Sequence, residues 1–473
     1  MAMLRRSRLE LKGHSSGRPR RSRGARIALA VVVLAAACAF FWGGLRRGPA
    51  PEIVLETQHA AIGKTNAVSA HFSNVDGGLG TVTLELVQGE RTVVLAERRF
   101  ARPGAFALGR GARTSTALLQ GVIGSTHQPW LREGEALLRA SADRMSGPLR
   151  AHTFVTVERK MTVRLRPPQV QLLSKQHFVR QGGSGLVVFQ VGDDGARSGV
   201  RAGAAEALSY AVAGSQGQRF CLFGVPWDLN DSSQIRLFAE DDAGNRVELP
   251  FVDLFKASPP RPATIEISDD FLARVVPAIA SQTPGFDARG TLLEQYLRLN
   301  GEYRRAALAQ LVELGRRSEP HRFWQGAFAQ MPKSAQRAGF AEDRSYRYYG
   351  RVVDRQTHLG LDLAATERAP VPAANSGRVV FAGWIPIYGN TVVIDHGFGL
   401  QSLYGHMSAL AVRGGENVRK GDLLGRSGAT GLAGGDHLHL ELLVQGTSVS
   451  PLEWLDEHWI HDNIASKLTL PGN

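Results

Sequence analysis

The sequence predicts a multidomain chain with a single N-terminal transmembrane helix, two all-β sandwiches, a helical connector and a C-terminal, mainly antiparallel β domain. Three observations lead to this organisation. An uncharged apolar run lies near the start, alternating β-type stretches fill much of the rest, and a short helical region separates two β-rich parts. The length of 473 residues, 43% hydrophobic and 21% charged, leaves room for about three domains and excludes collagen-like, largely disordered and multi-pass membrane proteins.

The formal net charge of +13 is concentrated at the N-terminus. Residues 1–47 hold eleven basic side chains and one acidic side chain, so the other 426 residues share a charge of +3. A nucleic-acid-binding protein would carry its basic residues as a patch on a folded face. This distribution predicts that the protein has no nucleic-acid partner.

Residues 27–45 (IALAVVVLAAACAFFWGGL) carry no charge and are just long enough to cross a hydrocarbon core as a helix. Nine basic residues precede this run and two follow it closely, so the positive-inside rule makes residues 1–26 a basic cytoplasmic tail and exports the rest. The alternatives are a cleaved signal peptide, for which AAACA is a poor cleavage site, and a lipoprotein modified at Cys38, where Ala35 replaces the usual large aliphatic residue. Only Cys221 then lies outside the membrane, which excludes an intrachain disulfide and a cysteine metal site.

Residues 50–166 and 167–257 each predict a β-sandwich of immunoglobulin-like size. Short alternating stretches such as Thr81–Val87 and Gly185–Val191 are typical of half-buried strands, and turn-forming residues separate them. Pro167-Pro168 marks the boundary between the two sets. Exported sandwiches usually act as spacers or binding modules, and nothing in these stretches indicates a ligand.

Residues 258–335 predict a linker followed by a helical hairpin. Ser258–Pro262 is proline-rich and stiff, Ser268 can cap a helix from Phe271 to Ile279, and Thr291–Leu314 has apolar residues at spacings of three and four. The hairpin could cover a cleft in the next domain or pack beside it, and packing is the simpler expectation.

The first candidate site is the motif His358-Leu359-Gly360-Leu361-Asp362. The alternation of Thr357–Leu363 predicts one strand, with His358 and Asp362 on the face opposite the leucines. In a straight strand these two residues would lie about 13 Å apart, too far for bonds of ~2 Å to one ion. Gly360 must therefore bend the chain if both are ligands. Alone, the pattern also fits a turn with a solvated carboxylate.

The second candidate site is a strand predicted over Asp436–Leu442, with His437, His439 and Glu441 on one face. Its two imidazoles would project about 7 Å apart at the base. A sheet with one polar face is the alternative, but two histidines at this spacing favour metal binding or catalysis. His406 and His396 lie in two further motifs, and either alone also fits a loop histidine bonded to the backbone.

Taken together, the motifs resemble the lysostaphin/LytM-type zinc metallopeptidases, which cut peptidoglycan cross-bridges. The resemblance covers about residues 340–456 and rests on the candidate sites with four further segments, Gly389–Gly397, Tyr404–Met407, Gly421–Gly425 and Gly428–Gly431. It implies one Zn²⁺ per chain held by His358, Asp362 and His439. It also implies that His406 and His437 act on the bound water and the substrate. The segment Ala433–Asp436 departs from the Ser-Thr-Gly-Pro-like approach common in the family, which leaves cleft shape and substrate preference open.

The chemistry of these residue types agrees with the resemblance. Two imidazoles and one carboxylate leave the fourth tetrahedral position of zinc for water, whose pKa then falls towards ~7. Because the sequence has no His-Glu-x-x-His motif, the other two histidines must handle the protons. Glu441 either orients His439 or is an exposed surface carboxylate.

We therefore expect residues 336–456 to form a peptidase domain, followed by a tail over 457–473. The predicted activity is zinc-dependent hydrolysis of peptide cross-links in peptidoglycan at the outer face of the bacterial cytoplasmic (inner) membrane. Its expected partners are peptidoglycan peptide stems and, through the sandwiches, cell-wall or division proteins. One alternative is a non-catalytic regulator that activates a cell-wall amidase, and another is a structural tether. The complete ligand set argues against both.

Overall fold

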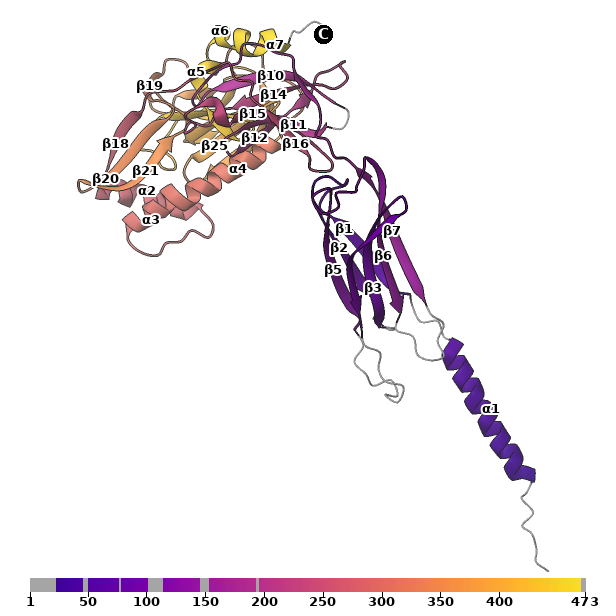
Figure 1. The fold of residues 1–473 in the computed structure, drawn as a ribbon. Helices are drawn as coiled ribbons and strands as arrows, with labels where there is room; N and C mark the ends of the chain where they lie inside the picture. The colour runs from indigo at the N-terminus through magenta and orange to yellow at the C-terminus, as the bar shows by residue number, and fades with distance from the viewer. Residues whose placement is uncertain are drawn as a thin grey trace, which may run out of the picture. The chain divides into compact units, whose positions relative to one another are not determined.

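The computed structural model describes residues 23–45, 50–75, 78–100, 114–144, 153–192 and 195–468. It divides into two compact units, residues 1–163 and 164–473. Most of the predicted basic tail, residues 1–22, and the end of the predicted C-terminal tail, residues 469–473, lie outside the described residues. The described part is mostly β with few helices, as predicted (Figure 1).

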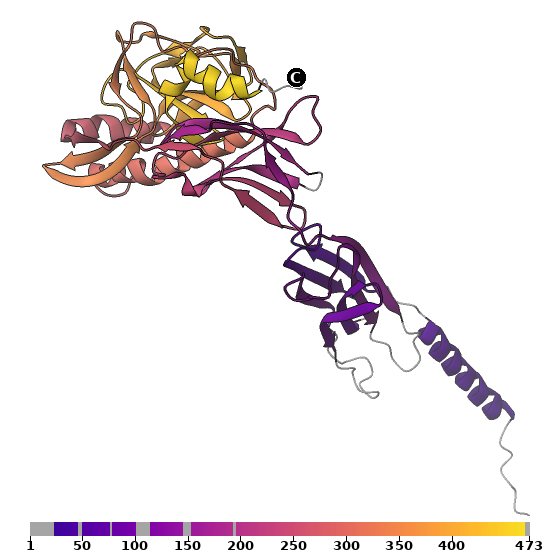
Figure 2. The same ribbon diagram turned by 45° about the horizontal axis from the view of Figure 1, so that its top comes forward.

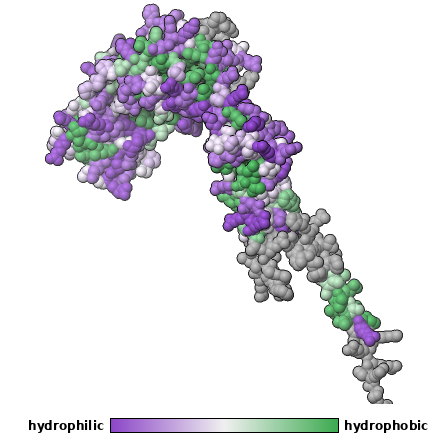
Figure 3. All heavy atoms as spheres, in the orientation of Figure 1, coloured by the Kyte–Doolittle hydropathy of each residue, from purple (hydrophilic) through white to green (hydrophobic). Residues whose placement is uncertain are grey.

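The helix predicted over residues 27–45 is present as α1 (Arg23–Leu45). Its apolar side chains from Ile27 to Leu34 are mostly exposed, and Figure 3 shows apolar residues in green along this helix. Over the described parts of the chain, no helix combines the length and apolar character needed to cross a membrane. The prediction that this segment spans a membrane is not confirmed.

The rest of the first unit is a β domain made of two antiparallel sheets, in the orders β1-β2-β5 and β4-β3-β6-β7. Buried residues alternate with more exposed ones along the strands, as Val68, Ala70 and Phe72 do, so each sheet has one apolar face. The immunoglobulin-like character is not confirmed. The strands are β1 (Glu52–Thr57), β2 (Asn66–Ser73), β3 (Leu79–Gln88), β4 (Arg91–Arg99), β5 (Thr116–Ile123), β6 (Gly134–Arg144) and β7 (Phe154–Val163).

The second unit begins with another pair of antiparallel sheets, in the orders β13-β14-β10-β8 and β12-β11-β15-β16, and β17 pairs with β9 in parallel. Both sheets contribute to one apolar core, for example through Val187 and Phe189 from one and Val200 and Leu237 from the other. The strands are β8 (Val170–Leu172), β9 (Phe178–Arg180), β10 (Ser184–Val191), β11 (Gly195–Ala202), β12 (Ala205–Leu208), β13 (Tyr210–Ala211), β14 (Gln218–Gly224), β15 (Ile235–Asp241), β16 (Arg246–Leu249) and β17 (Leu254–Lys256).

This second sandwich shares a core with the C-terminal domain. Strand β10 is buried on both faces, because Leu186 and Val188 point away from the sandwich core into a cluster that includes Leu440 and Trp454. Trp454 also donates its Nε1–H to Ser184 Oγ at 3.0 Å. The described residues from 164 onward therefore form one compact unit, in which the sandwich is a structural part of the C-terminal domain.

The connector contains a strand as well as the two predicted helices. Strand β18 (Arg261–Ile267) begins inside the predicted linker and joins a sheet with β20 (Glu342–Tyr348) and β21 (Arg351–His358). Helix α2 (Asp269–Gln282) is capped by Ser268, as predicted. The second helix runs through α3 (Leu292–Arg298), the short π-helix η2 (Leu299–Tyr303) and α4 (Arg304–Arg316). The helices lie side by side in both views (Figures 1 and 2).

The C-terminal domain is built on one antiparallel sheet in the order β19-β22-β30-β26-β25-β24-β28, with β31 paired to β30. This confirms the predicted C-terminal β domain. Its strands are β19 (Ala335–Ala338), β22 (Leu361–Ala364), β24 (Gly377–Ile385), β25 (Gly389–Gly397), β26 (Leu400–Met407), β28 (Asn417–Val418), β30 (Leu438–Val444) and β31 (Thr447–Val449), and a small second sheet contains β23 (Pro370–Pro372), β27 (Ala409–Leu410) and β29 (Leu423–Arg426).

The two faces of this sheet pack against different parts of the unit. Along β30, Leu438, Leu440 and Leu442 face the core shared with the second sandwich. On the opposite face Leu443 packs with Leu311 of α4. His439 and Glu441 alternate with the three leucines, so they lie on the same face as Leu443.

The segment named as the C-terminal tail is helical and packed from residue 457 to residue 468. Ile460 and Ile464 are buried in the core that holds Trp454. The apolar spacing of four residues explains why this short segment folds back. Its helices are α6 (Glu457–Ile460), the short π-helix η3 (His461–Ala465) and α7 (Ser466–Leu468), and α5 (Pro451–Trp454) precedes them.

Candidate metal centre

His358 and Asp362 lie at a crossing between two sheets, so the prediction of one strand over residues 357–363 is wrong. Strand β21 ends at His358 and β22 begins at Leu361 in the neighbouring sheet. The break brings His358 Nε2 to 2.9 Å from Asp362 Oδ1. The bend expected at Gly360 is therefore present.

Gly360 is also required because His439 occupies the space that a side chain would need. A Cβ atom at residue 360 would lie 2.7 Å from Cε1 and Nε2 of His439 and from the carbonyl oxygen of Leu440. Ordinary Cβ contacts are longer than this. The glycine of the motif thus lets the chain pass directly against the second histidine.

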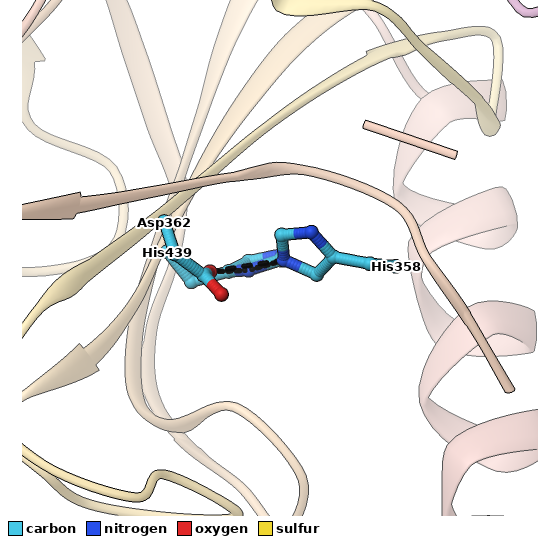
Figure 4. Close-up of side chains that lie close together, drawn as sticks. All are labelled: His358, Asp362 and His439. Atoms are coloured by element: carbon cyan, nitrogen blue, oxygen red, sulfur yellow. Dashed lines mark hydrogen bonds and ion pairs between the residues drawn. The ribbon is translucent and has the colours of Figure 1, made fainter. Parts of the chain in front are cut away.

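His439 reaches the same point from β30. Asp362 and His439 are paired directly across β22 and β30, and His439 Nδ1 lies 3.0 Å from Asp362 Oδ1. His358 Nε2 lies 3.1 Å from His439 Nδ1, and all three side chains are buried. Figure 4 shows the two rings and the carboxylate converging. One ligand atom from each residue lies within 4.8 Å of the others.

The hydrogen bonds on the outer ring atoms show that this cluster fits a cation. His358 Nδ1 lies 2.7 Å from the carbonyl oxygen of Gly339, and His439 Nε2 lies 3.4 Å from Glu441 Oε2. With its proton on that outer nitrogen, each ring directs a lone pair at the carboxylate oxygen. Three acceptors 2.9–3.1 Å apart repel one another unless a cation lies between them. Tetrahedral zinc with bonds of about 2.0–2.1 Å separates its ligand atoms by about 3.3 Å, a few tenths of an ångström more.

The electrostatics of the cluster favour positive charge. When a proton rather than a metal lies in the cluster, an inner ring nitrogen carries that proton and donates to Asp362. Burial raises the pKa of Asp362, but these hydrogen bonds from His358 and His439 outweigh burial and hold it well below its usual value. Burial lowers the pKa of His358. For His439 burial also acts downward, yet Asp362 and Glu441 raise its pKa to about 9. The ionised Asp362 carboxylate thus stabilises a cation here, either a proton or a metal.

Glu441 is fully buried, so the alternative of an exposed surface carboxylate is wrong. Its carboxylate accepts hydrogen bonds from Tyr388 Oη at 2.8 Å and from Ser448 Oγ, and it lies against His439. A carboxylate behind a ligand histidine fixes the orientation of the ring. The sequence alternation placed Glu441 on the correct face, but it carried no signal for Tyr388 or Ser448.

His406 and His437 join the cluster from a third direction. Their ring centroids lie 4.8 Å apart, and the His406 ring lies 5.8 Å from that of His439. His437 Nε2 is 3.6 Å from Asp362 Oδ1, and its side chain is 17% exposed, which makes it the more accessible member of the pair. Each ring is anchored through Nδ1 to a backbone carbonyl oxygen, that of Thr430 for His406 and that of Gly435 for His437. Because Nδ1 of each ring is bonded to the backbone, Nε2 is the ring atom that can take part in chemistry.

His406 has a backbone conformation that the sequence does not indicate. Its φ is 62°, in the left-handed region that residues other than glycine rarely adopt. Its N–H donates to the carbonyl oxygen of Tyr388 at 2.6 Å. Burial lowers the pKa of the His406 imidazole well below its usual value, with His437 and His439 acting in the same direction. This ring is therefore neutral at pH 7.

His396 does not join the site. It is buried, with Nδ1 2.7 Å from the carbonyl oxygen of Ser376 and Nε2 2.7 Å from Ser402 Oγ. Burial lowers its pKa to about 4. It is a structural histidine whose polar atoms are paired inside the protein, in line with the expectation that such a histidine alone is bonded to the backbone.

Arg344 is another residue near the cluster that the sequence did not indicate. Its Nη2 donates to Asp362 Oδ2 at 3.0 Å, on the side of the carboxylate away from the histidines. Arg344 lies in β20, eighteen residues before Asp362, and an isolated arginine in an alternating strand is typical of a solvated face. Only the pairing of β20 with β21 places it beside the site.

Comparisons with known proteins agree with this geometry. Residues 356–451 match peptidase family M23. The chain is 39% identical over 107 residues to the DD-carboxypeptidase/endopeptidase Mpg of Neisseria meningitidis, which is 23% of this chain and 25% of that protein. It is 36% identical over 110 residues to the murein hydrolase activator EnvC of Escherichia coli, 23% of this chain and 26% of that protein. The chain thus spans about a quarter of the length of these relatives.

A solved structure, the catalytic domain of lysostaphin from Staphylococcus simulans, is 26% identical and has a TM-score of 0.24, covering 28% of this chain and 98% of that one. The family match includes all five polar residues of the cluster. Four of them lie in strands, namely His358 in β21, Asp362 in β22, His406 in β26 and His439 in β30, and His437 lies just before β30. The C-terminal part of this chain is a peptidase family M23 domain, the lysostaphin/LytM-type family that its motifs resemble.

Proposed function

We propose that this protein is a zinc-dependent metalloendopeptidase that hydrolyses peptide cross-links of peptidoglycan. The observation that carries the proposal is the convergence of His358 Nε2, Asp362 Oδ1 and His439 Nδ1, with two further histidines beside them. When bound, zinc would supply a Lewis acid that lowers the pKa of water and polarises the scissile carbonyl group.

The two flanking histidines would move the protons. The neutral His406 imidazole, with Nδ1 held by Thr430, presents Nε2 as an acceptor for a proton from the attacking water. His437 is the more accessible ring, so we propose that it faces the substrate. There its Nε2, when it carries a proton, can donate to the developing oxyanion and to the leaving amine. Glu441 would hold His439 in the orientation required of a ligand.

A second candidate function is a regulator that binds and activates a cell-wall amidase. The similarity to a protein named murein hydrolase activator supports it. The complete set of ligand and proton-transfer residues favours the enzyme, because a regulator has no need to keep five polar residues in this geometry.

Zinc analysis and digestion of isolated sacculi by the full chain test the two candidates. We expect one zinc per chain and release of muropeptides identified by mass spectrometry. His439→Ala should lose both zinc and activity, whereas the His406→Ala, His437→Ala double variant should keep zinc and lose activity by roughly 10²-fold or more. Digestion at the wild-type rate by the double variant would contradict the enzyme. If the wild type binds zinc, digests nothing and accelerates an added amidase, the regulator is correct.

The proposed location is the outer face of the bacterial cytoplasmic membrane, with residues 27–45 as the anchor. Support comes from the sequence, in which nine basic residues precede this segment and two follow it closely. A reporter that is active only in the cytoplasm, fused to the C-terminus, should then be silent. A bright reporter would contradict the location without bearing on the zinc chemistry.

A further inference from the structure

Arg344 lies behind the ligand carboxylate rather than on the protein surface. Its side chain is 17% exposed, and its Nη2 contacts Asp362 Oδ2 at 3.0 Å. Asp362 Oδ1, the other oxygen, is the one that faces His358 and His439. The two oxygens of this carboxylate therefore have separate partners, the guanidinium on one side and the imidazoles on the other.

Glu342 holds Arg344 in this position and connects it to the other ligand of the same motif. Glu342 Oε2 accepts from both Nε and Nη2 of Arg344 at 3.2 Å. Glu342 Oε1 accepts from the backbone N–H of Gly339 at 2.6 Å. The carbonyl oxygen of Gly339 in turn accepts from His358 Nδ1 at 2.7 Å. These bonds form a circuit that runs from Asp362 through Arg344, Glu342 and Gly339 to His358, whose Nε2 lies 2.9 Å from Asp362 Oδ1.

The circuit fixes the tautomer of His358 and the orientation of the Asp362 carboxylate. At His358 the bond to Gly339 keeps the proton on Nδ1 and leaves the Nε2 lone pair for the ion. At Asp362 the bond to Arg344 occupies Oδ2 and leaves only Oδ1 directed at the histidines. A carboxylate free to rotate can bind a cation through both oxygens, which would fill a position that hydrolysis needs for water.

We propose that Arg344 is a positioning residue that keeps Asp362 a one-oxygen ligand and so keeps the fourth position of the metal open. This inference rests on the proposed zinc site and extends it to a residue outside the family match, which begins at residue 356. Arginine suits the task because its planar fork contacts two carboxylates at once, here those of Asp362 and Glu342.

A positioning role for Arg344 and a purely electrostatic effect of its charge predict opposite changes in zinc affinity when the side chain is removed. A positive side chain beside the site repels the ion, so its removal would tighten zinc binding if charge were its only effect. If Arg344 positions the carboxylate, its removal weakens binding, because loss of such a supporting contact typically reduces metal affinity about 10- to 100-fold. The sign of the change therefore separates the two effects.

The experiment uses the full chain with Arg344→Met, Arg344→Lys and the control Arg347→Met. Arg347 lies in the same strand and is exposed. Zinc affinity is measured by competition with a chromophoric chelator, and the Co²⁺-substituted forms are compared by their visible absorption. We expect Arg344→Met to bind zinc 10- to 100-fold more weakly, with weaker Co²⁺ bands that indicate a higher coordination number. Arg344→Lys keeps the charge and should recover part of the affinity, and Arg347→Met should match the wild type.

Tighter or unchanged zinc binding by Arg344→Met, with an unchanged Co²⁺ spectrum, would overturn the proposal. If that variant does not fold, Glu342→Gln replaces it, since this change removes the charged partner of Arg344 and keeps an acceptor for Gly339. It should also weaken zinc binding and alter the Co²⁺ spectrum, and wild-type behaviour would again overturn the proposal. Failure of the wild type itself to bind zinc would reject the proposed function instead.

Discussion

The two faces of β30 differ in what they contact, although they belong to one seven-residue strand. Leu438, Leu440 and Leu442 pack into the core shared with the second sandwich, whereas His439 and Glu441 face the proposed zinc site. The comparison teaches that one alternating strand keeps the residues of the apolar core apart from those of the proposed zinc site. Changes on the apolar face should alter the free energy of unfolding, and changes on the polar face should alter zinc affinity.

The largest effect is expected for Gly360→Ala on the polar side. The added Cβ would meet the His439 ring and the carbonyl oxygen of Leu440 at 2.7 Å, so either the ring or the strand must move. We expect loss of stoichiometric zinc and of sacculus digestion, measured by metal analysis and muropeptide release. Gly434→Ala is the control, because its Cβ would meet nothing within 4 Å. Full zinc occupancy in Gly360→Ala would contradict this account of the motif.

The opposite face is tested by Leu440→Ala. This side chain is 2% exposed, and its removal leaves a cavity in the shared core, which should lower the free energy of unfolding by about 2–5 kcal/mol. Zinc stoichiometry of the folded variant should remain that of the wild type. Denaturant unfolding with metal analysis checks both, with the half-exposed Leu423→Ala as the control. Zinc loss at unchanged stability would mean that the two faces are not separable.

The junction between the second sandwich and the C-terminal domain should depend on pH through Glu453. Burial raises the pKa of this carboxyl group to about 7, even though the Ser184 N–H, at 2.7 Å, and Arg180 favour the charged form. The folded chain therefore binds the proton more tightly than the unfolded chain. The stabilisation is complete below the unfolded pKa of 4.5 and is lost as the pH rises through about 7.

Glu453→Gln isolates this contribution. Relative to the variant, wild-type stability should fall by up to about 3 kcal/mol between about pH 4.5 and pH 8. The measurement is denaturant unfolding across this pH range, with the exposed neighbour substituted as Glu457→Gln as the control. Equal pH profiles for the wild type and Glu453→Gln would show that the buried carboxyl group does not govern the junction.

The smallest effect is expected for a pair of tyrosines on opposite faces of the sheet. Tyr388→Phe removes the hydroxyl that donates to Glu441 at 2.8 Å, and zinc affinity should weaken about tenfold as His439 loses support. Tyr404→Phe removes a hydroxyl on the apolar side, which accepts from the Ala374 N–H at 2.8 Å. It should lower stability by about 1–3 kcal/mol and leave zinc affinity unchanged. Equal zinc affinities in the two variants would weaken the comparison between the faces.

Local patterns predicted the parts of the site that depend on a single strand. The alternation from His437 to Leu442 placed His439 and Glu441 on one face, and the leucines between them on the other. The same reasoning was wrong for residues 357–363, because the chain changes sheets at Leu359–Gly360. A period of two describes a continuous strand and carries no information about where a strand ends within a favourable pattern.

The sequence by itself determined that the chain is mostly β, that its C-terminal domain resembles a zinc peptidase, and which five polar residues converge there. Only the tertiary structure decided that the second sandwich shares a core with that domain, that Arg344 stands behind Asp362, and that His406 takes a left-handed backbone. The physical reason is the distance along the chain over which each kind of interaction acts. Residue type and alternation act within a strand, whereas burial and hydrogen bonding depend on segments far apart in the chain, such as Ser184 and Glu453.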